Sequence, residues 1–116
     1  PRSYANWDWE EDAHMVWRHT GVNDVLILGF KSQEKIPGAD LELQLTQSNN
    51  YGIVTLSVNE TEAVTFDGYA PAIKVEKLHI KGVDIKEGWN TVRVTVKGKN
   101  PNSTNYVFGI DYLKVR

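Results

Sequence analysis

The chain has 116 residues and no cysteine, which excludes disulfides, a thiolate nucleophile and a zinc–thiolate site. Its 13 Lys and Arg against 15 Asp and Glu give a net charge of −2, which argues against a dedicated nucleic-acid-binding protein, and no apolar run reaches a membrane span of roughly 20 residues. One domain is predicted over residues 1–116, and since the chain begins at Pro1 without an apolar leader, we expect a fragment or mature form of a larger protein.

The first dozen residues are acidic and aromatic and show no periodicity. Trp7 and Trp9 stand among the carboxylates Asp8, Glu10, Glu11 and Asp12. Such hard oxygen ligands suit calcium, but a run of carboxylates is equally typical of a solvated lead-in to a strand.

Beyond this segment, apolar and polar residues alternate with period two, which is typical of half-buried strands. In 39–47, for example, Leu41, Leu43 and Leu45 alternate with polar residues. Glycine, proline and asparagine turns separate about eight predicted strands at 14–19, 24–30, 39–47, 51–59, 62–66, 77–85, 89–97 and 106–115. Since no helical stripe occurs, the sequence predicts an all-β fold, a two-sheet antiparallel β-sandwich of the jelly-roll type.

Aromatic residues outside the core pattern are the strongest functional signal. Trp89 lies on the polar face of its strand, Trp7 and Trp9 lie outside the alternating pattern, and Tyr51 and Tyr69 border turns. The candidate ligand-binding residues are these five rings together with the loop asparagines Asn100 and Asn105. Sugars stack on exposed rings while amide groups bind their hydroxyls, so this composition favours a glycan site. The alternative is that the rings cap the core and the asparagines form turns.

Catalytic signals are weak. His14, His19 and His79 lack metal-ligand spacing, no nucleophile-elbow or phosphate-loop motif occurs, and nothing selects an acid pair for glycosidic chemistry. We therefore predict a noncatalytic domain. Asp111 is unusual, because alternation places it on the side of Leu113 and Val115, where a carboxylate needs a partner or a cation. The alternative is a position at the sheet end, where the alternation no longer demands burial.

Two C-terminal segments, DIKEGWNTVRV at 84–94 and FGIDYLKV at 108–115, resemble the corresponding strands of galactose-binding-like carbohydrate-binding modules of families 6 and 35. The segments 51–59, 66–71 and 98–101 are similar to accessory domains of bacterial glycoside hydrolases. The resemblance implies a jelly roll, a secreted (extracellular or periplasmic) protein and a structural calcium site. It assigns calcium to Asp111, with Glu10 and Asp12 as the nearest first-strand carboxylates, and it assigns the asparagine of the sugar cleft to Asn105.

The leading interpretation is a noncatalytic carbohydrate-binding module that recognises a poly- or oligosaccharide through exposed aromatic rings and Asn or Asp side chains at loop ends. It would act beside catalytic or other domains of the same polypeptide. The second interpretation is a structural or protein-interaction domain in which Trp7, Trp9 and Trp89 form an interface. The third is a small enzyme, or one half of an enzyme's active site.

Overall fold

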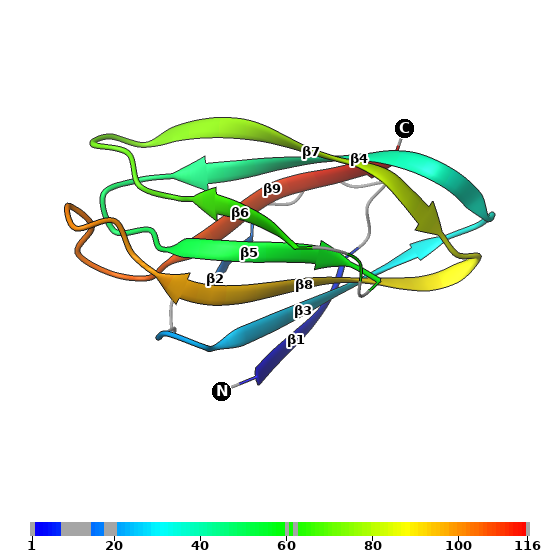
Figure 1. Cartoon of the computed structure of the whole chain (residues 1–116), viewed down its shortest axis with the longest axis horizontal. Helices are drawn as coiled ribbons and strands as arrows, with labels where there is room; N and C mark the ends of the chain where they lie inside the picture. The colour runs from blue at the N-terminus through cyan, green and yellow to red at the C-terminus, as the bar shows by residue number, and fades with distance from the viewer. Residues whose placement is uncertain (1, 8–14, 18–20, 60, 62, 116) are drawn as a thin grey trace.

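A computed structural model describes residues 2–7, 15–17, 21–59, 61 and 63–115, with backbone alone for 2–7 and 15–17. Within these residues the chain forms nine strands and no helix (Figure 1). The strands are β1 (Arg2–Trp7), β2 (Met15–Trp17), β3 (Val25–Ser32), β4 (Ile36–Gln47), β5 (Ile53–Val58), β6 (Val64–Asp67), β7 (Lys74–Ile85), β8 (Gly88–Gly98) and β9 (Phe108–Val115).

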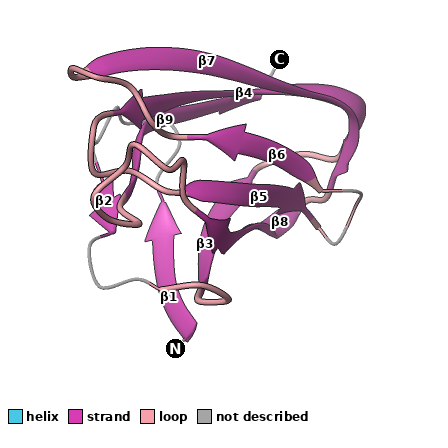
Figure 2. Ribbon diagram, turned by 60° about the vertical axis from the view of Figure 1, so that its left-hand side comes forward, coloured by secondary structure: helices cyan, strands magenta, loops and turns pink. Residues whose placement is uncertain are grey.

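The strands form two sheets that pack face to face. One sheet has the order β1-β3-β8-β5-β6 and the other the order β2-β9-β4-β7 (Figures 1 and 2). Every pairing is antiparallel except that of β1 with β3, which is parallel. From β3 to β9 the chain passes repeatedly from one sheet to the other, so the predicted two-sheet β-sandwich is confirmed.

Alternation along the strands explains the core. Val54, Leu56 and Val58 of β5 and the three valines of β8 point inward at every second position, and the three leucines of β4 do the same from the opposite sheet. Each is almost completely buried, and burial of such side chains supplies most of the driving force for folding. The largest fully buried side chains are Phe30, Leu28, Leu41, Leu43, Leu45, Leu56, Ile85, Ile110, Leu113, Val54, Val58 and Val83.

Three strands differ from the sequence prediction. β4 begins at Ile36, three residues before the predicted start, because register shifts against β7 at this end interrupt the alternation. β1 was not predicted, because it is an edge strand that backbone pairing with β3 defines, whereas its residues show no alternation. β7 begins at Lys74, three residues before the predicted start, because its first residues are all exposed and show no alternation of buried and solvated side chains. No helix that could cross a membrane occurs in the part of the chain that the structure describes.

Candidate functional site

Three loop segments meet at one end of the sandwich, on the left of Figure 1. They comprise residues 48–52, 67–70 and 98–107, and we call them the Asn-rich end. Isolated bridges join Ser48 to Tyr69 and Tyr51 to Val107, and the Thr104 N–H donates to the Asn49 carbonyl over 3.0 Å. Backbone hydrogen bonds therefore fasten segment 48–52 to each of the other two.

Ser103 anchors the longest of these loops from inside. It is buried, and its hydroxyl lies 2.7 Å from the Tyr51 carbonyl oxygen and 3.0 Å from the Asn105 carbonyl oxygen. The Lys99 ammonium donates to the Ser103 carbonyl over 3.0 Å. A buried hydroxyl with two acceptors holds the loop in one conformation, because moving it would strand a polar group.

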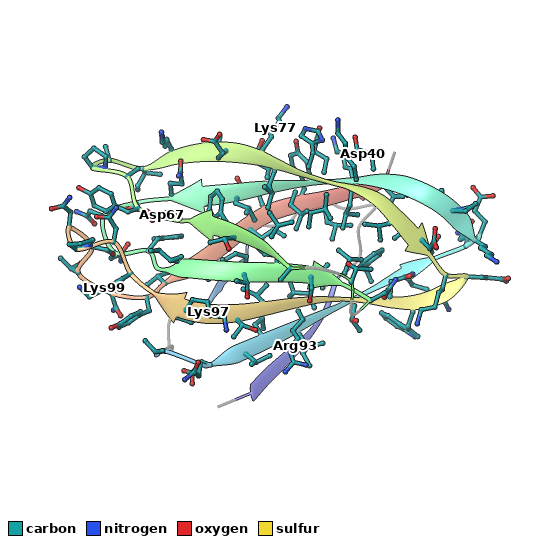
Figure 3. The ribbon with its side chains drawn as sticks, in the orientation of Figure 1. Asp40, Asp67, Lys77, Arg93, Lys97 and Lys99 are labelled. Atoms are coloured by element: carbon teal, nitrogen blue, oxygen red, sulfur yellow. The ribbon has the colours of Figure 1, made fainter. Side chains whose placement is uncertain are left out.

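Asn100 and Asp67 tie two loops together through their side chains. Asn100 Nδ2 donates to Asp67 Oδ2 over 3.1 Å, and Asn100 Oδ1 accepts from the Asn102 N–H over 3.0 Å. The other oxygen of Asp67 accepts from the Tyr69 N–H over 2.9 Å. Asn100 therefore shapes this end of the molecule, where Figure 3 shows Asp67 and Lys99.

Apart from Pro101, the side chains open to solvent at the Asn-rich end are polar. Asn49, Asn102 and Asn105 are exposed, and the Tyr69 ring is half-buried beside them in the same set of loops. Asn105 Oδ1 accepts from the Tyr106 N–H over 2.8 Å, which leaves its Nδ2 as a donor for solvent or a ligand. The surface thus offers amide donors and acceptors next to a tyrosine ring.

Tyr51 does not provide the exposed ring that its position at a turn predicted. It is only 8% exposed, and a Cβ on Gly109 would lie 2.9 Å from its hydroxyl oxygen. The ring therefore packs against the glycine backbone of β9 and closes this end of the core. A turn residue can point inward where the turn covers the end of a sandwich.

The tryptophans lie elsewhere. Trp89 is 54% exposed but begins β8, whereas the Asn-rich loop leaves the end of that strand. Since β8 has 11 residues, about 3.3 Å each, roughly 30 Å separates the two positions. The Trp7 backbone pairs with Phe30, whose own partner is Asn90, so it also lies at the Trp89 end. Trp9 falls outside the described residues.

Asp111 does not face the core as the alternation predicted. β9 pairs Tyr112 with Gln44 and Ile110 with Leu45, so Asp111 is the extra residue of a β-bulge. The bulge turns Ile110 and Leu113 inward and leaves Asp111 half-buried, where it accepts from Gln44 Nε2 over 3.0 Å. The Gln44 amide is thus a hydrogen-bond partner of the kind that the sequence analysis expected for this carboxylate.

Calcium stays a prediction. Among the described residues no three His, Asp or Glu side chains are grouped to hold a metal ion. The other predicted ligands, Glu10 and Asp12, lie outside the described residues.

A polar network on the outer face of the β9-β4-β7 layer was missed from the sequence. The buried Glu42 accepts from the Tyr112 hydroxyl over 2.8 Å, and its other oxygen lies 3.6 Å from His79 Nε2. His79 Nδ1 lies 3.4 Å from Asp40 Oδ1, and the Lys114 ammonium lies 4.6 Å from the Tyr112 ring centroid. The sequence contained one sign of this network, the polar residues that alternate with the leucines of 39–47. The register of β7 and β9 against β4 is what brings residues 79 and 112 to them, and the sequence alone does not give that register.

Comparison with known proteins places the fold. The strands define the class of fold, an all-β two-sheet sandwich. No family model and no curated protein matches the chain. Among solved structures, a Paenibacillus xanthan lyase superposes with a TM-score of 0.64 over 90% of this chain, at 19% sequence identity. The match covers only 12% of the lyase chain, so this sandwich corresponds in fold to a small part of a much larger protein.

Proposed function

We propose that the chain is a noncatalytic accessory module of a larger, secreted carbohydrate-active protein, and that it binds a glycan at the Asn-rich end. The observation that carries the proposal is the convergence of Tyr69, Asn100 and Asn105 on one rigid, solvent-facing end of the sandwich. The fold shared with part of a polysaccharide-acting enzyme supports the same class of protein.

The chemistry of this end suits a sugar. The exposed Asn49 and Asn102 amides each offer a donor and an acceptor, Asn105 offers its Nδ2 donor, and the half-buried Tyr69 ring offers an apolar face for the C–H groups of a pyranose. The loops are already fixed by Ser103 and Asp67, so binding costs little ordering entropy. In this arrangement Asn100 positions the loop, and Asn105 and Tyr69 contact the ligand.

A binding role fits the nearest carboxylate better than a catalytic one. Both oxygens of Asp67 already accept hydrogen bonds from Asn100 and from the Tyr69 backbone. Glycoside chemistry requires a second carboxyl group across a cleft, held to donate a proton. Asp67 instead serves as a structural acceptor, and we propose that any catalysis belongs to other domains of the parent polypeptide.

The test is retention of the folded chain on a panel of immobilised polysaccharides, including xanthan, with calcium and with chelator. We expect Tyr69→Ala and Asn105→Ala to reduce affinity at least tenfold while leaving the melting temperature nearly unchanged. Trp89→Ala, at the opposite end, is the matched control and should bind as the wild type does. Folded protein that binds no glycan in either condition would overturn the proposal, and equal binding with chelator would remove calcium from it.

A second candidate is a structural or protein-interaction domain, favoured by the exposure of Trp89. Exposed tryptophan is enriched at interface hot spots, and the Trp7 backbone lies on the same end of the sandwich. In this case Trp89→Ala would weaken contact with a neighbouring domain of the parent protein, and Tyr69→Ala would have no effect on it.

A further inference from the structure

β7 forms an open edge of the four-stranded sheet. Its one strand partner among the described residues is β4, so its other side carries backbone N–H and C=O groups without a ladder (Figure 2). The strand is 12 residues long, and residues 74–77 at its start are all exposed. A long edge of this kind is a template for another strand.

Apolar side chains gather at the start of this edge. Ile73 is 80% exposed and Val75 is 51% exposed, and they are two of the four large hydrophobic residues exposed in the described chain. Val75 pairs directly with Thr46, which places it on the outer face of the sheet with Lys77, the partner of Gln44. β-Branched residues side by side on an open edge favour strand pairing.

The charges around Val75 are self-complementary. Directly opposed residues of two antiparallel strands have side chains on the same face of the sheet, and successive residues of a strand alternate in face. When the two strands are identical and related by a two-fold axis, opposed residues therefore differ by an even number, and one residue lies opposite its own copy on the axis. With Val75 on the axis, Lys74 of each copy lies opposite Glu76 of the other. Ile73 then lies opposite Lys77, whose aliphatic stem can cover it.

Neighbouring registers are excluded by like charges. An axis at Lys74, Glu76 or Lys77 would place that residue opposite its own copy, and directly opposed like charges destabilise a sheet. Val75 is the one position from 74 to 77 that avoids this. The charges of residues 74–77 therefore favour the register centred on Val75 over the registers centred on its neighbours.

We propose that a second copy of this chain docks on the β7 edge, antiparallel and centred on Val75, so that the two four-stranded sheets join into one. The contact consists of main-chain hydrogen bonds, a Val75 pair on the axis and two Lys74–Glu76 ion pairs. It is independent of glycan binding, and because β7 begins next to Tyr69, it brings the Asn-rich ends of the two copies together at the junction.

Sedimentation velocity over a wide concentration series tests the proposal. We expect the wild-type mass to rise toward twice that of the monomer. Lys74→Glu and Glu76→Lys should each raise the dimer dissociation constant at least tenfold, since each replaces two attractive pairs with two repulsive ones. A mixture of the two single variants should form a heterodimer, because all opposed charges then attract, and the double variant should dimerise as the wild type does.

Val75→Lys should abolish the dimer by placing two ammonium groups on the axis, and Val22→Lys, at an equally exposed valine away from β7, is its control. Circular dichroism and melting curves confirm that each variant is folded. A wild-type chain that stays monomeric at all concentrations would overturn the proposal. So would a dimer that survives Val75→Lys, or one that Trp89→Ala removes, because that dimer would use another surface.

Discussion

Replacing Asn90 with alanine should cost more stability than any other change to an asparagine of the structure. Asn90 is 0% exposed, at the start of β8. Its Oδ1 accepts from the Lys86 N–H over 2.9 Å and from Asn59 Nδ2 over 2.8 Å. Its Nδ2 donates to the carbonyl oxygens of Lys86 over 3.0 Å and Gly88 over 3.2 Å. One amide thus closes the β7–β8 turn and fastens it to the end of β5.

The expected loss follows from these four bonds. Each contributes about 1 kcal/mol net, and the backbone groups of the exposed turn can regain water, so Asn90→Ala should lower the free energy of unfolding by about 3–4 kcal/mol. For a chain of this size that corresponds to a fall in Tm of roughly 12–16 °C. Urea titration at equilibrium measures it as a lower midpoint with an unchanged m-value.

Two variants sharpen this prediction. Asn90→Asp keeps the accepting oxygen but loses both bonds donated by Nδ2, and it buries a charge, so it should be destabilised at least as much. Asn105→Ala, which removes one bond at an exposed site, should cost about 1 kcal/mol or less. A loss below about 1 kcal/mol for Asn90→Ala would refute the claim that this amide holds the turn.

Two further changes test the loops and the outer face. Gly68→Ala places a Cβ 2.8 Å from a backbone carbonyl oxygen and should cost about 1–3 kcal/mol in urea unfolding, whereas Gly98→Ala, with nothing within 4 Å, should be nearly neutral; equal effects would contradict the close approach. Tyr112→Phe removes the hydroxyl donor of the buried Glu42 and should destabilise the chain by about 1–3 kcal/mol, and an unchanged urea midpoint would show that the hydroxyl adds nothing to stability.

The sandwich could be predicted because most strands have one buried and one solvated face. The leucines of 39–47 and the valines of 89–97 are inward as the alternation required. The alternation of apolar and polar residues does not predict a strand such as β1, which backbone pairing rather than burial defines. It also fails where one inserted residue exchanges the inward and outward positions, as at Asp111. A bulge cannot be seen in one strand alone, since it exists only relative to the partner's register.

The site could be predicted only in part. The turn-forming asparagines and Tyr69 do meet at one end, because the loops that connect the two sheets of a sandwich lie at its ends. Trp89 was grouped with them by residue type, but the length of β8 carries it to the other end. Asn100, the buried Tyr51 and the network around Glu42 depend on contacts between distant segments, which a period-two pattern does not encode.

Under the proposed function, the separation of structural from exposed residues at the Asn-rich end bears on how the binding specificity could change. The shape of the loops depends on Ser103, Asp67 and backbone pairing, whereas the exposed side chains of Asn49 and Asn102 make no hydrogen bond with the described residues. Mutations at the outer positions are therefore decoupled from folding. Substitutions at positions 49 and 102 could therefore sample new ligands on an unchanged backbone, as antibody loops do on their framework.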